Sequence, residues 1–146
     1  MKTEVKKFEE LSVQELYDIL QLRAEVFVVE QDCVYQDMDG KDQVALHVMG
    51  REEGKLVAYT RLFAPGAFYE DASIGRVITQ NKARGRGYGR EIMLRSIQAL
   101  EEVSGKTSIT IAAQSYLRKF YRELGFVEIG SEFLEDGIPH IKMVRS

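Results

Sequence analysis

The sequence predicts a single α/β domain with a mixed, mostly antiparallel sheet flanked by helices. Three observations support this prediction. The 146 residues, 45% of them hydrophobic, suffice for one buried core and match the size of one domain. No repeat or low-complexity linker divides the chain. Strand patterns and helix patterns follow one another along it, which is typical of a sheet covered by helices.

The N-terminal third predicts a short strand followed by a helix. Residues 3–8 have a strand pattern, and Ser12 with Glu15 has the spacing of a capping box at a helix start. We expect the helix to break near Arg23. Across residues 13–27, apolar residues recur at helical spacing: Val13, Leu16, Tyr17, Leu20, Ala24 and Phe27.

Three strands in an antiparallel meander are predicted next. Residues 44–50 and 55–63 alternate as strands on either side of the turn at 51–54. A third strand, at residues 73–79, follows the loop around Pro65 and Gly66. With turns between them, the three strands are expected to pair in chain order as an antiparallel meander.

The second half predicts two helices and three more strands. Met93, Ile97 and Leu100 mark one helical face, and Gly125 is placed to end a later, short helix. That short helix carries apolar residues at i, i+3, i+4 and i+7: Leu117, Phe120, Tyr121 and Leu124. The strands are expected at residues 107–113, 126–133 and 138–144, the last two joined by a tight turn at Asp136 and Gly137.

Composition narrows the class of protein. The formal net charge of -3 argues against a surface for the phosphate backbone of nucleic acid, so no nucleic-acid partner is predicted. Cys33 is the one cysteine, which fits a reducing compartment without disulfides. The N-terminal residues contain no apolar signal region, and no run of residues is apolar enough to span a bilayer. We therefore predict a cytoplasmic protein with no membrane partner.

The stretch ARGRGYGREIM, at residues 83–93, predicts an anion site. A glycine-rich turn that leads into a helix presents unpaired N–H groups and the positive end of the helix dipole. A dinucleotide fingerprint fails here because Arg90 stands where a count from Gly85 requires glycine. A phosphate loop of the Walker type fails because the Gly-Lys-Ser/Thr ending is absent. A flexible surface loop with solvated arginines stays open as the alternative.

The spacing Arg84-x-x-Gly87-x-Gly89 resembles the signature of the GCN5-related N-acetyltransferases, the GNAT superfamily. GRVIT at residues 75–79 and FYRELGF at residues 120–126 resemble that family's preceding strand and its downstream helix. The order of elements is also similar to the GNAT fold, the acyl-CoA N-acyltransferase fold, over residues 1–146. Residues 22–42 and 135–143 look like the ElaA-type branch.

This resemblance implies acetyl-CoA as the donor co-substrate, with its diphosphate on the glycine-rich turn. It also implies that main-chain groups of the preceding strand pair with the pantetheine arm and polarise the thioester carbonyl. Gln114 stands where relatives often carry an asparagine that contacts the cofactor. The implied binding residues are Val77, Ile78, Thr79, Arg84, Gly85, Arg86, Gly87, Tyr88, Gly89, Arg90 and Gln114.

The resemblance places a general acid at Tyr121, where a protonated hydroxyl can donate to the departing thiolate. A core role for Tyr121 is the alternative, because the residue lies on an apolar stripe. Glu30, His47 and Glu132 are candidates for the general base. Alternation in the strand favours a structural role for His47, and the same judgement applies to His140.

An acidic series precedes the meander: Glu30, Asp32, Asp37, Asp39 and Asp42. A calcium loop counted back from Gly40 reaches Leu46 where a bidentate glutamate is needed, so no metal is predicted. A solvated loop is the default, and an acidic wall that attracts a cationic amine is the alternative. Cys33 has no activating neighbour in sequence, so direct transfer is favoured over a cysteine nucleophile.

The predicted function is therefore transfer of an acetyl group from acetyl-CoA directly to a small-molecule or peptide amine. A homodimer is left open. The same start at Arg23 and Phe27, followed by Asp39 and Asp42, also resembles acyl-homoserine-lactone synthases, which gives an acyltransferase of that kind as one alternative. A non-catalytic module that binds and senses acyl-CoA is the other.

Overall fold

A computed structural model describes residues 1–146 and contains seven strands and three α-helices. The strands are β1 (Lys2–Lys7), β2 (Leu46–Glu52), β3 (Lys55–Phe63), β4 (Ala72–Thr79), β5 (Ile109–Gln114), β6 (Val127–Glu135) and β7 (Ile138–Arg145). The helices are α1 (Val13–Arg23), α2 (Tyr88–Ser104) and α3 (Arg118–Arg122), and a π-helical segment, η2 (Ala24–Glu30), continues α1. The predicted order of elements is confirmed. None of the helices is both long enough and apolar enough to span a bilayer.

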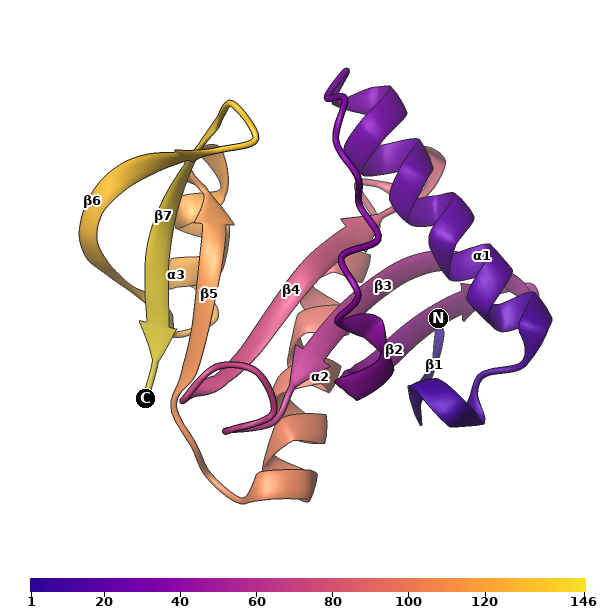
Figure 1. Cartoon of the computed structure of the whole chain (residues 1–146), viewed down its shortest axis with the longest axis horizontal. Helices are drawn as coiled ribbons and strands as arrows, with labels where there is room; N and C mark the ends of the chain where they lie inside the picture. The colour runs from indigo at the N-terminus through magenta and orange to yellow at the C-terminus, as the bar shows by residue number, and fades with distance from the viewer.

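All seven strands form one mixed sheet in the order β1-β2-β3-β4-β5-β7-β6 (Figure 1). Pairing is antiparallel from β1 to β4 and again among β5, β7 and β6, so the predicted meander and hairpin are both confirmed. The parallel pair β4 and β5 is short. It joins Ala72 to Ile109 and Ser73 to Thr110, after which the two strands diverge.

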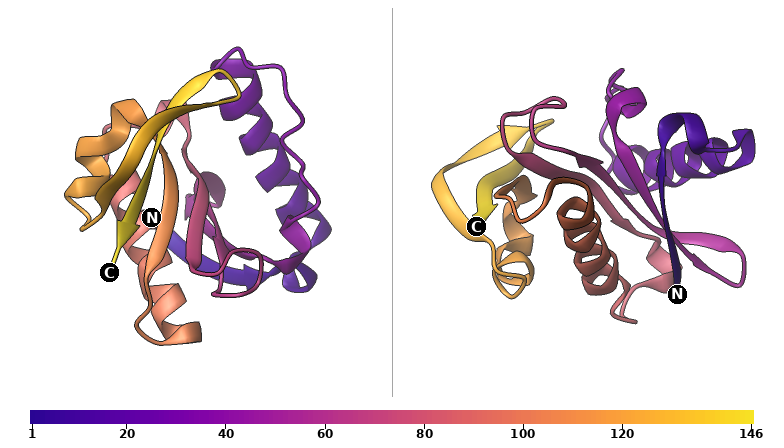
Figure 2. Two further views of the ribbon diagram at one scale, coloured as in Figure 1. Left: turned by 60° about the vertical axis from the view of Figure 1, so that its left-hand side comes forward. Right: turned by 90° about the horizontal axis from the view of Figure 1, so that it is seen from below.

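Helices cover both faces of the sheet, with α1 on one face and α2 and α3 on the other (Figure 2). Buried Ile92, Met93 and Leu100 of α2 belong to the larger core, which lies between that helix and the sheet. The smaller core joins α1 to Met49 and Tyr59 on the opposite face. Both faces of the central strands are therefore buried, which fixes their register.

The first helix begins as predicted but presents a different face to the sheet. Ser12 Oγ accepts a hydrogen bond from the Glu15 amide at 3.0 Å, and the Glu15 carboxylate accepts one from the Ser12 amide. Val13 and Tyr17, on the predicted apolar stripe, are exposed. The residues that pack are Ile19, Leu22 and Val26. Apolar residues occupy two neighbouring sides of this helix, and only one side can meet the sheet.

Turn chemistry follows the sequence in the second half. Gly125 has φ +92° and ends α3, where the Phe126 amide bonds back to the Tyr121 carbonyl at 3.1 Å. Asp136 and Gly137 have φ values of 52° and 76°, as a two-residue turn of type I′ requires between β6 and β7. Both predicted turns are confirmed.

Candidate active site

A cleft of about 680 Å³ opens where β4 and β5 diverge. Its walls include Ile74 and Val77 of β4 and Ile111 of β5. At one end the Cys33 thiol donates to the Asp136 carbonyl at 3.4 Å, which joins the segment after η2 to the β6–β7 turn. The cleft is thus bordered by four separate parts of the chain, and no sequence pattern indicated the contact between Cys33 and the turn.

The β4 wall of the cleft contains a β-bulge. Arg61 pairs with Gly75 and Tyr59 with Ile78, so the one residue between them on β3 faces two residues of β4. Arg76, in the bulge, has φ 50°, a left-handed conformation that costs a non-glycine residue energy. Because β4 has also left β5 here, its main chain borders the cleft as an unpaired strand edge. An extended ligand can add to such an edge.

The glycine-rich turn lies beside this edge and leads into α2. Gly85 and Gly87 have φ values of +85° and +77°, and no atom lies within 4 Å of a Cβ at either position. Their requirement for glycine is therefore conformational. At Gly89 a Cβ would lie 3.5 Å from the Phe120 ring and 3.6 Å from Thr79 Oγ1. The first amides of this 17-residue helix form an electropositive end next to the cleft.

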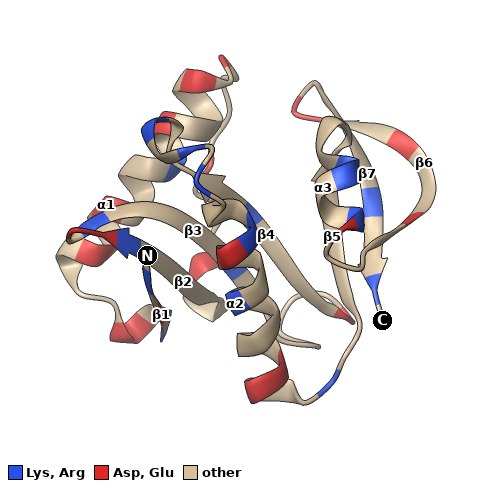
Figure 3. Ribbon diagram, turned by 180° about the vertical axis from the view of Figure 1, so that it is seen from behind, with Lys and Arg blue, Asp and Glu red and all other residues tan.

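The three arginines of the turn differ in position. Arg84 lines the cleft, donates to the Thr79 carbonyl at 3.1 Å and pairs with Glu30 at 2.7 Å. Arg86 pairs with Glu52 at 3.0 Å outside the cleft, and Arg90 is exposed. Charges of both signs occur in each half of the molecule in Figure 3.

The binding residues implied by the family resemblance also fall into two groups, those that line the cleft and those that lie outside it. The cleft is lined by Val77, Ile78, Thr79, Arg84, Gly85, Gly89 and Gln114. The others lie on the turn or the first residues of α2 without lining the cleft: Arg86, Gly87, Tyr88 and Arg90.

Tyr121 lies both in the core and in the wall of the cleft. Its ring is 5% exposed and packs edge-on against Phe120 and Phe126. Burial raises the pKa of its hydroxyl, which therefore stays protonated at neutral pH. The hydroxyl makes no hydrogen bond within the protein, yet it is not sealed from the cleft. Tyr121 thus meets a general acid's first requirement, access to the site with a proton to donate.

The predicted base candidates lie in three different environments. Glu30 lines the cleft and is held by Arg84. His47 is fully buried outside the cleft, where Tyr59 Oη lies 2.6 Å from Nδ1 and the Asp42 carbonyl 2.9 Å from Nε2. Both ring nitrogens are occupied, which supports the structural role for His47. Glu132 is exposed on β6 and does not line the cleft.

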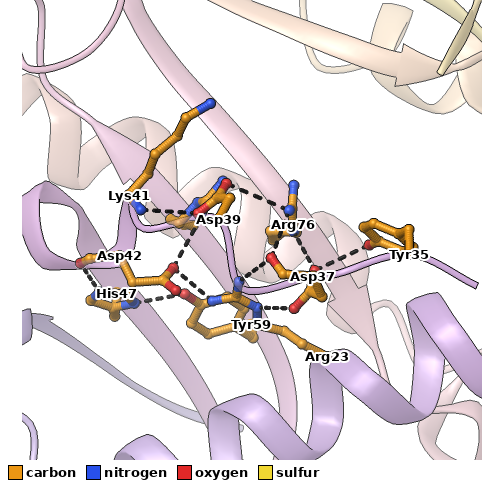
Figure 4. A network of polar contacts seen from close by, with 10 residues as sticks. Arg23, Tyr35, Asp37, Asp39, Lys41, Asp42, His47, Tyr59 and Arg76 are labelled. Atoms are coloured by element: carbon orange, nitrogen blue, oxygen red, sulfur yellow. Dashed lines mark hydrogen bonds and ion pairs between the residues drawn. The ribbon is translucent and has the colours of Figure 1, made fainter. Parts of the chain in front are cut away.

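The acidic series corrects the sequence prediction, because Asp37, Asp39 and Asp42 form neither a solvated loop nor an acidic wall. They join Arg23 and two further arginines in a network of ion pairs (Figure 4). The distances are 2.7 Å for Arg23 to Asp37 and to Asp42, 2.8 Å for Arg61 to Asp39, 2.9 Å for Arg61 to Asp42 and 2.7 Å for Arg76 to Asp37.

This network is buried and nearly neutral. Arg23 is 0% exposed and Arg61 4% exposed. Burial alone would raise the pKa of the Asp42 carboxyl, but hydrogen bonds from Arg23 and Arg61 lower it overall. The acidic residues by themselves did not indicate this network. The available signal was the single arginine in each of two largely apolar strands, Arg61 in β3 and Arg76 in β4.

Comparison with known proteins agrees with this architecture. The model of the acetyltransferase (GNAT) domain family matches residues 8–146. Protein ElaA of Escherichia coli (strain K12) is 41% identical over 138 residues, which are 93% of this chain and 90% of that protein. A UPF0039 protein of Synechocystis is 41% identical over 139 residues, 94% of this chain and 90% of its own length.

Solved structures show the same fold. An acyl-CoA N-acyltransferase from Pseudomonas aeruginosa superposes with a TM-score of 0.95 at 42% identity, covering 100% of both chains. The Escherichia coli ElaA structure superposes with a TM-score of 0.93 at 37% identity, covering 99% of both. The acyl-homoserine-lactone synthase LasI, at 15% identity, shares the fold alone, with a TM-score of 0.76 over 98% of this chain and 88% of that one. The chain belongs to the GNAT acetyltransferase domain family, and the ElaA-like proteins are among its relatives.

Proposed function

We propose that this protein transfers the acetyl group of acetyl-CoA to an amine of a small molecule or peptide. One observation carries the proposal. The unpaired edge of β4 at Val77, the glycine-rich turn with Arg84, and the Tyr121 side chain all border the same cleft. An edge strand suits an extended pantetheine arm, a helix N-terminus with a guanidinium suits a diphosphate, and a protonated hydroxyl suits a leaving thiolate.

The proposed roles follow from these positions. Arg84 and the amides from Gly85 to Gly89 bind the diphosphate. The main chain of β4 at the bulge holds the arm, and an N–H there polarises the thioester carbonyl. The amine attacks that carbonyl directly, and Tyr121 gives its proton to the sulfur. None of these roles needs a metal ion. The lone thiol at Cys33 fits a cytoplasmic location for the reaction.

Two alternatives make different demands. An acyl-homoserine-lactone-synthase-like enzyme would need a wide acyl tunnel and a docking face for an acyl carrier protein, and the likeness to LasI is one of fold. A sensor module would bind acyl-CoA without turnover. Turnover by the native chain separates the sensor from our proposal.

The experiment measures thiol release from acetyl-CoA across a panel of amines, for the native chain and for Tyr121→Phe. We expect the variant to lose about 10²-fold or more in turnover, because general acid catalysis contributes on that scale. Its affinity for CoA should barely change, since the ring and its packing are kept. Tyr17→Phe, on the exposed side of α1, is the matched control. Equal turnover in Tyr121→Phe removes Tyr121 from the mechanism, and CoA binding by a native chain without turnover supports the sensor.

A further inference from the structure

A second histidine lies in the wall of the cleft. His140, on β7, is paired in the sheet with Gln114 of β5 on one side and with Phe133 of β6 on the other. Its ring stacks on the Phe133 ring, with 6.0 Å between the ring centroids. It is 7% exposed and lines the cleft that Tyr121 also lines. The strand pattern predicted a structural residue here. Its position in the cleft raises the question of which ring nitrogen is available.

Hydrogen bonding fixes the tautomer of His140. Its Nδ1 lies 2.7 Å from the Ile138 carbonyl oxygen. A carbonyl can only accept a hydrogen bond, so Nδ1 carries the proton and donates it. Nε2 then holds the lone pair. The carboxylate of Glu135 lies 3.5 Å from Nε2, so an imidazolium formed there would have an anion beside it.

His47 shows the opposite arrangement and serves as an internal comparison. Its Nε2 faces the Asp42 carbonyl and must donate, and its Nδ1 accepts from the Tyr59 hydroxyl at 2.6 Å. The lone pair of His47 is therefore consumed inside the fold. The lone pair of His140 is not consumed by any donor of the protein.

The charges around the cleft indicate which kind of amine His140 would meet. Arg61 and Arg76 line the cleft but are neutralised by the aspartates behind them, and Arg84 is paired with Glu30. Glu135 and Asp136, at the hairpin, also line it, and neither is paired with lysine or arginine. This end of the cleft attracts a cation, and the cationic form of an amine acceptor must lose a proton before it can attack.

We propose that His140 is the general base of this site, that Glu135 passes on to solvent the proton that His140 takes, and that the acceptor is an amine that arrives as the ammonium ion. The inference rests on the proposed function. The ammonium gives one proton to Nε2, and the nitrogen lone pair then forms the C–N bond with the thioester carbonyl carbon. The C–S bond breaks, and sulfur leaves with the electron pair and takes the Tyr121 proton.

The protons balance as follows. After the attack, the nitrogen still carries one excess proton. His140 first releases the proton that it took from the ammonium ion through Glu135, whose side chain is 54% exposed. The excess proton then leaves the nitrogen by the same route. Tyr121 regains one proton from solvent. Two protons therefore leave the nitrogen, one is carried off by the thiol, and the net reaction releases one to solvent.

The kinetic test uses His140→Asn, which keeps a donor for the Ile138 carbonyl and lacks a basic nitrogen. We expect turnover of benzylamine, which is protonated at neutral pH, to fall about 10²-fold, with CoA affinity and thermal stability close to native. With methoxyamine, which is largely neutral at the same pH, the loss should be under about tenfold, because no proton has to be removed first. Added imidazole should restore activity to His140→Ala. Equal losses for both amines and no rescue would mean a structural role and would overturn the proposal.

A second readout does not depend on activity. The chain contains two histidines, so an imidazole ¹⁵N spectrum has two ring systems, and His47→Gln assigns them. We expect His140 as the Nδ1–H tautomer and His47 as the Nε2–H tautomer. The opposite tautomer at His140 would sink the proposal. A native chain that turns over no amine at all contradicts the proposed function itself, whereas native turnover with an unaffected His140→Asn contradicts only the role of His140.

Discussion

Two regions of this molecule each contain three arginines, and they hold them in different ways. In the buried network, Arg23, Arg61 and Arg76 have side chains that are 0%, 5% and 23% exposed, and each is bound by aspartates. On the glycine-rich turn, Arg84 and Arg86 are 42% and 55% exposed, and each has one glutamate. The first set is committed to the fold, and the second set is available to an anion from solution.

The buried network still contributes to the cleft, through the shape of its wall. Arg76 is the residue of β4 with φ 50°, and its side chain is held by the Asp37 carboxylate at 2.7 Å and the Asp37 carbonyl at 3.0 Å. Asp37 in turn is held by Arg23. A strained backbone persists only where its surroundings over-determine it. The network therefore supports the bulge that borders the cleft, and two of its members, Arg61 and Arg76, line the cleft themselves.

The largest effect should come from breaking the network at its most buried arginine. Arg23→Met leaves Asp37 and Asp42 short of a partner inside the protein, so we expect the free energy of unfolding to fall by about 3–5 kcal/mol. Arg86→Met is the matched change on the turn and should cost under about 1 kcal/mol, because exposed pairs contribute little. Denaturant unfolding measures both. Similar losses in the two variants would mean that the two regions are not different in kind.

The next effect separates affinity from stability on the turn. Gly87→Glu and Gly105→Glu each put a side chain at positive φ, +77° and +71°, with no atom within 4 Å of the new Cβ. They cap opposite ends of α2. Gly87 is in the left-handed helical region with ψ 11°, whereas Gly105, with ψ -172°, is in a region that essentially only glycine adopts, so the control carries the larger backbone strain. We expect Gly87→Glu to weaken CoA binding about 10- to 100-fold, because a carboxylate then faces the diphosphate. Gly105→Glu should leave affinity unchanged in calorimetric titration. Equal affinities would remove the turn from the binding site.

The sequence predicted what local patterns determine and missed what distant residues determine. Strand periodicity, the periodicity of the later helices, the capping box at Ser12 and the turn at Asp136 all depend on residues a few positions apart, and the structure confirms them. The side of α1 that meets the sheet depends on packing against distant strands and was predicted wrongly. The partners of Asp37 lie 14 and 39 residues away, so a run of aspartates looked like a solvated loop. His47 and His140 have similar strand contexts. Only their partners in space distinguish a buried lone pair from one that faces the cleft.

As the pH falls, His47 should be the first group of the buried region to lower the free energy of unfolding. Burial lowers the pKa of His47 below its ordinary 6.5, so as the pH falls below about 6.5 the unfolded chain binds a proton that the native chain does not bind until its own, lower pKa is reached. Stability present above pH 6.5 is therefore lost as the pH falls, by up to about 1.4 kcal/mol per pH unit. His47→Gln should be less stable at pH 7 and should lack this part of the slope. Asp39 and Asp42, whose pKa values are lowered by their arginines, contribute losses only at pH values below about 4.

The smallest effect distinguishes the two ion pairs of the turn. Arg84 is shared between Glu30 and any diphosphate in the cleft, whereas Arg86 and Glu52 pair outside it. An exposed pair of this kind is worth about 0.2–1 kcal/mol, so Glu30→Gln should strengthen CoA binding about 1.4- to fivefold by releasing Arg84. Glu52→Gln should not change the affinity. A gain in affinity with Glu52→Gln would add Arg86 to the binding site. Weaker binding with Glu30→Gln would mean that Glu30 holds Arg84 in its binding position, so that Glu30 assists the ligand and does not compete with it.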